Sequence, residues 1–139
     1  MLLTPDDRSA IAELISLHGH LFDEGELDRL DELFTDDVVY DLRDFGQEPL
    51  RGIDAIRAAA LELGGANPLA HHVTNIVITE IDDDAAAARS KGLAVLEGGK
   101  LGSVTYVDTV RRGAAGWRIS SRKVVARRAP LGGRGEPSQ

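Results

Sequence analysis

The second half of this chain is a succession of β-branched segments joined by short turns, and that feature constrains its fold most. Strand-like alternation predicts four strands, over residues 72–81, 86–96, 101–111 and 117–126. An aspartate triplet and two glycine-containing links join them, as is typical of tight turns between antiparallel neighbours. The alanines of 86–96 leave a helix as the alternative for that segment. The pattern as a whole indicates a mostly antiparallel sheet.

Helical spacing of apolar residues is confined to the first half of the chain. Thr4 suits an N-cap, Pro5 the first helical position, and Gly25 the C-terminal stop of the helix between them. The same reasoning predicts further elements before the sheet: a short helix over 27–34, a strand around 38–42 and a helix over 54–63. Helices followed by consecutive strands indicate an α+β fold, with N-terminal helices packed into a curved sheet. A sheet that curls around the first helix would enclose a pocket.

The charge balance argues against nucleic acid as a partner. The chain has 139 residues and a net charge of −7. Binding phosphates requires clustered Lys and Arg. A basic run lies late in the chain, but strand alternation would divide it between two faces of a sheet: Arg118, Arg122, Lys123, Arg127 and Arg128. We interpret these residues as solvated strand edges and a basic tail.

Length and composition predict a single domain over residues 1–128. Residues 129–139 have no apolar periodicity and are expected to form a disordered tail. The chain has no cysteine, which excludes disulfides, thiolate catalysis and Cys-ligated metal sites. Its first residues lack the features of a signal peptide, and no apolar run approaches the roughly 18–20 residues that a membrane span needs. We therefore expect a cytoplasmic protein without a membrane partner.

Six short motifs follow one another in the order found in a known family. They are LFDEGELD and LDELF within 21–34, DDVVYD at 36–41, RGIDAI at 51–56, HHVTN at 71–75, AAARS at 86–90, and YVD, GWRI and Arg122 within 106–122. No single motif is specific, but together they cover nearly the whole chain. In this order they resemble the SnoaL-like branch of the nuclear transport factor 2-like superfamily, which includes relatives of scytalone dehydratase, polyketide cyclases and ketosteroid isomerase.

The resemblance implies a cone-shaped α+β barrel with a deep pocket, and a homodimer formed through the sheet. Such proteins include dehydratases, isomerases, cyclases, epoxide hydrolases and members without known activity, so the fold does not decide the function. For this chain it predicts a lyase, isomerase or cyclase that applies acid-base chemistry to a small hydrophobic metabolite. We expect no cofactor, and no metal site because His71 and His72 point to opposite faces of a strand.

His71 and Asp23 are the first candidates for catalysis. The resemblance aligns His71 with an acid/base histidine of the scytalone-dehydratase-like branch, and imidazole suits that role because its ordinary pKa lies near neutral pH. It also places Asp23 in the pocket, where a carboxylate would orient His71 and fix its tautomer. Strand alternation places Val73, Asn75 and Val77 on the His71 face. The alternative for His71 is a structural histidine without a chemical role.

Further candidates are expected to line the pocket. Tyr106 shares a strand face with Asp108, and a phenol there would donate a hydrogen bond to a substrate carbonyl or a developing enolate. The alternative is a half-buried tyrosine satisfied by a neighbour. His18 lies on the apolar face of the first helix, where the family commonly has a tyrosine. We expect the substrate-binding residues to be His18, Phe22, Tyr40, Asn75 and Asp108.

A non-catalytic ligand-binding protein is one alternative to the enzyme. The dehydratase branch has a second histidine on the strand that matches 86–96, and this chain has Val95 nearby instead. A binding protein predicts histidines tied to backbone carbonyls. The enzyme predicts His71 and Asp23 within hydrogen-bond reach of each other, in a pocket sealed from bulk water.

An epoxide hydrolase is a second alternative. It would activate a water molecule between Asp23 and Asp108. That arrangement also requires an arginine beside the two carboxylates, and the sequence offers Arg89 or Arg43 for that place if either points inward. The direction of these two side chains therefore separates the hydrolase from the proton-transfer enzyme.

Overall fold

The computed structural model describes residues 3–133. In this part of the chain the regular elements are α1 (Pro5–Asp23), β1 (Phe34–Asp41), β2 (Leu50–Arg51), α2 (Ile53–Leu63), β3 (Ala70–Asp82), β4 (Ala85–Val95), β5 (Leu101–Gly113) and β6 (Gly116–Ala126). Short 3₁₀ helices lie between them, at Leu27–Glu32, Arg43–Phe45, Gly64–Ala66 and Glu97–Gly99. The strands predicted in the second half are all present, and the alanine-rich segment is a strand, β4.

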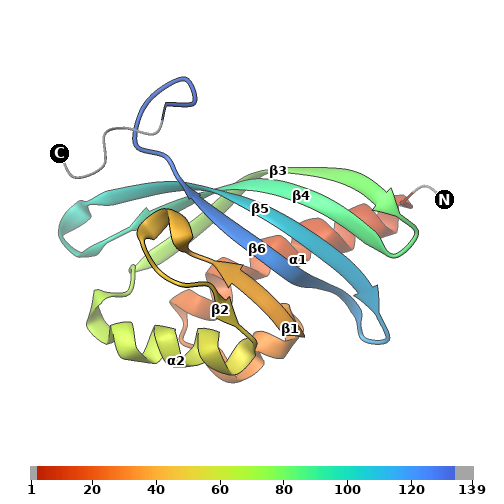
Figure 1. Cartoon of the computed structure of the whole chain (residues 1–139), viewed down its shortest axis with the longest axis horizontal. Coiled ribbons are helices and arrows are strands. Elements are labelled where there is room, and N and C mark those ends of the chain that lie inside the picture. Colours follow the sequence, from red (N-terminus) through yellow and green to blue (C-terminus); the bar gives the residue numbers. More distant parts are fainter. Residues whose placement is uncertain (1–2, 134–139) are drawn as a thin grey trace.

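The strands form a six-stranded sheet in the order β2-β1-β6-β5-β4-β3. Neighbouring strands are antiparallel, except that β1 and β6 run parallel. α1 lies across one face of the sheet, and α2 lies beside β1 and β2 (Figure 1). The predicted α+β fold and mostly antiparallel sheet are confirmed. The sheet is not closed into a barrel, because β2 and β3 are its two edges.

α1 begins where the sequence predicts. The hydroxyl of Thr4 accepts a hydrogen bond from the backbone N–H of Asp7, and the Asp7 carboxylate accepts one from the backbone N–H of Thr4, both at 3.0 Å. This reciprocal cap satisfies two donors that a helix start leaves free. Asp7 also accepts from Arg112 at 2.8 Å, which ties the start of α1 to β5. Gly25 follows the helix with a φ of +69°, as a C-terminal stop requires.

The helix predicted over 27–34 is present as a 3₁₀ helix, and the prediction is wrong only for its last two residues. A 3₁₀ helix covers Leu27–Glu32, and β1 begins at Phe34. Leu33 and Phe34 are both buried. Leu33 also accepts a hydrogen bond from the backbone N–H of Ile119 on β6, at 2.9 Å. Pairing with the sheet therefore overrides the helical spacing.

β3 contains one extra residue after Thr74 relative to its partner strand. Asn75 adopts a φ of +57° there, a conformation that asparagine tolerates better than most residues. Val73 before the bulge and Ile76 after it both pack against the core. The alternation predicted through 73–77 therefore reverses at the bulge.

β6 also contains one extra residue, Ser120, relative to β5. The register set by the hairpin alone would place Ser121 opposite Asp108. The bulge places Arg122 there instead and turns its side chain to the inner face of the sheet, where it is fully buried. This one-residue shift brings a cation into the interior.

The chain after β6 is described only in part. Residues 129–133 form turns and bends after β6, whereas 134–139 of the predicted tail lie outside the described residues. Among residues 3–133, no helix combines the length and apolar character needed to cross a membrane.

Candidate active site

A cavity of about 750 Å³ lies between α1, α2 and the inner face of the sheet. Most of its wall is aliphatic or aromatic. The polar side chains that line it are few: His18, Tyr40, Gln47, Glu62, Asn67, His71 and Tyr106. A largely apolar cavity with a small number of polar groups is the usual form of a site for a small molecule.

His71, near the start of β3, is hydrogen-bonded to Asp23 at the end of α1. Its Nδ1 lies 2.7 Å from Oδ1 of Asp23, and its backbone N–H donates to Oδ2 of the same carboxylate at 2.9 Å. Because a carboxylate only accepts, Nδ1 carries a proton, and Nε2 of the neutral ring keeps its lone pair. The contact expected from the sequence is formed. It is not sealed from solvent, since the two side chains are 17% and 23% exposed.

Gly19 allows α1 to approach β3 closely enough for this contact. A Cβ at Gly19 would lie 2.5 Å from the backbone oxygen of His71, closer than real Cβ contacts come. Asp23 lies one helical turn further along the same side of α1. The glycine therefore sets the distance at which the Asp23 carboxylate meets His71.

A second charged network lies deeper in the molecule. Nε and Nη2 of Arg122 donate to the two carboxylate oxygens of Asp108, at 2.8 and 2.9 Å, and both side chains are fully buried. Nη1 of Arg122 lies 2.8 Å from Nδ1 of His18. A guanidinium has no acceptor, so Nδ1 of His18 must accept this hydrogen bond. The His18 ring is therefore neutral and carries its proton on Nε2.

Burial and charge both favour the neutral form of His18. The pKa of His18 lies well below its ordinary value, mainly because the ring is buried. The charge of Arg122 and the neighbouring His71 lower this pKa further. Burial would also lower the pKa of Arg122, but the charge and hydrogen bonds of Asp108 outweigh it and hold that pKa above its ordinary value. The network is thus a permanent ion pair beside an uncharged imidazole.

Tyr106 lies beside both histidine systems. Its ring centroid is 5.4 Å from that of His18, and the Arg122 guanidinium lies 4.2 Å from it. Gly92 on β4 makes room for the ring, because a Cβ there would lie 2.5 Å from a Tyr106 ring carbon. Burial raises the pKa of Tyr106, so its hydroxyl stays protonated and able to donate.

The structure brings only some of the expected substrate-binding residues to the cavity. His18, Phe22 and Tyr40 line it, and the rings of His18 and Phe22 are 4.6 Å apart. Asn75 does not line it, because the β3 bulge leaves this side chain exposed. Asp108 does not line it either, because Arg122 engages both of its carboxylate oxygens.

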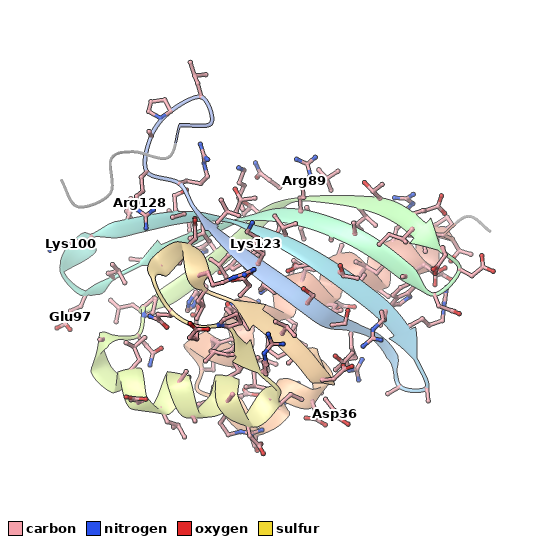
Figure 2. The ribbon with its side chains drawn as sticks, viewed as in Figure 1. Asp36, Arg89, Glu97, Lys100, Lys123 and Arg128 are labelled. Atoms are coloured by element: carbon pink, nitrogen blue, oxygen red, sulfur yellow. The ribbon has the colours of Figure 1, made fainter. Side chains whose placement is uncertain are left out.

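The arginines expected for a hydrolase do not reach the cavity. Arg89 is exposed and projects away from the sheet (Figure 2). The Arg43 side chain is 71% exposed and pairs with Asp41 at 2.7 Å. Neither lies beside Asp23 or Asp108, so the arrangement that the hydrolase requires of these two arginines is not formed.

Arg122 is the residue of the site that the sequence reasoning missed. The sequence pattern predicts a solvated basic run that includes Arg122, whereas the side chain is fully buried. One signal was present: Arg122 is in phase with Val124 and Ala126, which are also inward-facing. Asp108, which the sequence also places on an inward face, is a second signal, because a buried carboxylate needs a cation or several hydrogen-bond donors. The bulge that joins these signals leaves no mark in the sequence.

No group of three or more His, Cys, Asp or Glu side chains among residues 3–133 is placed to hold a metal ion. His18 and His71 do approach each other, with ring centroids 5.3 Å apart. Nδ1 of each ring is already hydrogen-bonded to a charged side chain, Arg122 in one case and Asp23 in the other. The two rings are thus organised by protein partners.

The comparisons with known proteins agree with this fold. The sequence matches the family model of the SnoaL-like domain over residues 4–123. A solved NTF2-like protein with a cystatin-like fold from Novosphingobium aromaticivorans is 30% identical, with 86% of this chain and 80% of that chain covered and a TM-score of 0.72. A candidate aromatic ring hydroxylase from the same organism is 28% identical, with coverages of 88% and 90% and a TM-score of 0.76.

A solved structure of lower sequence identity supports the fold as well. A candidate scytalone dehydratase from Novosphingobium aromaticivorans is 21% identical, with 90% of this chain and 89% of that chain covered and a TM-score of 0.74. At this identity the likeness shows the fold alone. No curated protein matches the sequence.

Proposed function

The chain belongs to the SnoaL-like domain family, and we propose that it is a cofactor-independent enzyme that moves protons on a small, largely apolar metabolite. The reaction class is dehydration, isomerisation or ring closure. His71 is the general acid/base, Asp23 fixes its tautomer, and Tyr106 donates a hydrogen bond to a substrate oxygen. The cavity of about 750 Å³, with its mostly apolar wall, has room for such a molecule.

The hydrogen bond between His71 and Asp23 is the observation that carries this proposal. At 2.7 Å, it holds the proton of the neutral ring on Nδ1. His71 also lines the cavity, and its Nε2 makes no hydrogen bond to another described residue. A base oriented by a carboxylate on its far nitrogen is the arrangement used for proton abstraction in many enzymes.

The proposed reaction begins with removal of a proton from the carbon next to a carbonyl. Nε2 of His71 takes the proton, the C–H electron pair forms a C=C bond, and the carbonyl π pair moves onto oxygen. Tyr106 stabilises that oxygen by donating its O–H. Protonated His71 then returns the proton to a second carbon in an isomerisation, or to a leaving hydroxyl that departs as water in a dehydration.

The site geometry favours this reading over the two alternatives. A passive binding protein predicts histidines tied to backbone carbonyls, whereas His71 is bound to a carboxylate and His18 to a guanidinium. The hydrolase needs an arginine among two carboxylates, whereas Arg122 serves Asp108 and His18.

Mass spectrometry of a metabolite extract incubated with the protein in D₂O tests the proposal. We expect at least one compound to gain deuterium, or to lose water, with the native protein and not with His71→Gln. The matched control is His72→Gln, because His72 is exposed on the opposite face of the same strand. Identical product profiles for the native protein and His71→Gln would contradict the proposal.

A further inference from the structure

Two neighbouring histidines in the cavity carry their protons on different nitrogens. The rings of His18 and His71 meet edge to face, with centroids 5.3 Å apart. The Asp23 carboxylate accepts from Nδ1 of His71, while the Arg122 guanidinium donates to Nδ1 of His18. His71 therefore offers a lone pair on Nε2, and His18 offers an N–H on Nε2.

Four side chains within residues 3–133 surround the His18 ring, and Arg122 and His71 are the two that favour its neutral form. Arg122 on β6 occupies Nδ1, Tyr106 on β5 and His71 on β3 lie beside the ring, and Phe22 lies one turn away on α1. His18 is only 2% exposed but lines the cavity. Its Nε2–H has no hydrogen-bond acceptor among the described residues. An unpaired donor of this kind requires a partner when the cavity fills.

The charges around the cavity exclude an anionic partner for this donor. Among the described residues that line the cavity, none is Lys or Arg. The charge of Arg122 is paired with that of Asp108, and Asp23 and Glu62 add negative charge, behind His71 and on the wall of the cavity. A carboxylate or phosphate bound there would lose its water and gain no cation. An uncharged acceptor, such as a ketone oxygen, meets the Nε2–H without that cost.

We propose that His18, held by Arg122 as a neutral Nε2–H donor, binds the oxygen of an uncharged carbonyl substrate. His18 is then a second catalytic residue of the site, and Arg122 is a positioning residue that acts through it. A neutral donor suits this role, because it lowers the energy of a developing enolate without transferring its own proton.

The catalytic part of this inference rests on the proposed function. His71 removes the proton next to the carbonyl, and His18 and Tyr106 donate hydrogen bonds to the oxygen as it becomes negative. No proton leaves His18, so His71 is the group that both removes and returns a proton, and the proton can exchange with D₂O while the partly exposed His71 holds it. The binding part does not depend on catalysis, because it requires only the Nε2–H of His18.

Nitrogen-15 NMR of the histidine rings tests the role of Arg122. We expect His18 to carry its proton on Nε2 throughout pH 5.5–8. In the double variant Arg122→Met with Asp108→Leu, which removes both charges together, His18 should show a mixture of tautomers. The His71 signals serve as the internal control and should keep the Nδ1–H form. A charged His18 in the native protein, or an unchanged His18 in the double variant, would overturn the assignment.

Binding of three matched probes by calorimetry tests the substrate class. They are 1-tetralone, which has a ketone, tetralin, which lacks it, and 1-naphthoate, which carries a charge. We expect 1-tetralone to bind about tenfold more tightly than tetralin, the effect of one good hydrogen bond. We expect 1-naphthoate to bind no better than tetralin. The preference for the ketone should weaken in His18→Phe, where Tyr106 is the remaining donor, and should be unchanged in His20→Gln, a change at an exposed histidine of the same helix.

The probe experiment and the deuterium experiment fail independently. Equal binding of 1-tetralone and tetralin, or tighter binding of 1-naphthoate, would overturn the role of His18 whatever His71 does. A ketone preference that depends on His18, together with no turnover that depends on His71, would overturn the proposed reaction and leave the carbonyl site standing.

Discussion

The two histidine sites of the cavity are built on the same plan with opposite charges. His71 is held through Nδ1 by an aspartate, in a contact whose side chains are 17% and 23% exposed. His18 is held through Nδ1 by an arginine, beside an ion pair whose members are fully buried. The charge of the partner decides which nitrogen keeps the proton. The degree of burial decides how much of the fold depends on the contact.

The difference explains why one molecule contains both arrangements. A base must be reached by the substrate, and the partial exposure of His71 leaves it accessible, although it is not sealed from water as the sequence predicts. A fixed donor must not change its protonation state, and burial beside a cation keeps His18 neutral. Variants that alter one of the two sites at a time, with the other site as the reference, separate these two effects.

Asp108→Asn should have the largest effect on stability. The change leaves the Arg122 charge buried without a counter-ion, and breaking one side of a buried pair costs about 3–5 kcal/mol. Asp23→Asn should cost about 1 kcal/mol, because water can replace part of the lost interaction at the more exposed site. Urea unfolding measures both free energies.

The double variant Asp108→Leu with Arg122→Met is the control for this comparison. It removes both charges, and the free energy of unfolding should return to within about 1 kcal/mol of the native value or exceed it. If Asp108→Asn lowers the free energy of unfolding by no more than Asp23→Asn does, the fold does not depend more strongly on the buried ion pair than on the exposed contact.

The His71–Asp23 site could be predicted from the sequence, whereas the His18–Arg122 site could not. The order of motifs identifies the first, because α1 begins at a clear cap and the motif at 71–75 opens a clear strand. The second depends on the extra residue at Ser120, which turns Arg122 inward. Bulges follow from the packing of the whole sheet, and local alternation does not reveal them.

The same limit explains the other differences from prediction. The exposed position of Asn75 follows from the bulge in β3. The strand at Phe34 follows from pairing with β6, which is more than 80 residues away in sequence. Caps, hairpins and the α+β order rest on local chemistry and were predicted, whereas register and inward-facing charge rest on distant partners.

Gly19→Ala should disturb the His71 site selectively. The added Cβ would meet the backbone oxygen of His71 at 2.5 Å and force α1 away from β3. Overpacking costs about 1–3 kcal/mol, and the better helix propensity of alanine returns about 1 kcal/mol. NMR should show loss of the fixed Nδ1–H form at His71 and no change at His18. Gly65→Ala is the control, because no atom lies within 4 Å of the new Cβ.

Acid should weaken the fold through His18. The native state keeps this ring uncharged, whereas the unfolded chain protonates it near pH 6.5, so the unfolded state binds more protons as the pH falls. Above about pH 7 both states keep His18 neutral, so the free energy of unfolding has its full value. As the pH drops through 6.5, that free energy declines. One group contributes at most about 1.4 kcal/mol per pH unit.

Urea unfolding between pH 5.5 and 7.5 measures this slope. The range lies above the region in which carboxylates with lowered pKa values, such as those of Asp7 and Asp41, lose their contribution. His18→Phe should flatten the curve, and His20→Gln should leave it unchanged. A slope that persists in His18→Phe would mean that another group is responsible.

Ser90→Ala should have the smallest effect and sharpens the comparison at the buried site. Ser90 pairs with Tyr106 across β4 and β5 and is 2% exposed. Its hydroxyl has no hydrogen-bond partner among the described residues, unlike the polar groups of the Arg122 network. Removing an unsatisfied polar group breaks no hydrogen bond and relieves its desolvation, so we expect the free energy of unfolding to stay the same or to rise by up to about 1 kcal/mol.

Ser120→Ala is the control. The Ser120 hydroxyl donates to the Thr109 carbonyl at 3.2 Å, so its removal should lower the free energy of unfolding by about 0.5–1 kcal/mol. A larger loss at Ser90 than at Ser120 would show that the Ser90 hydroxyl makes a stabilising hydrogen bond, and would contradict its description as an unsatisfied group.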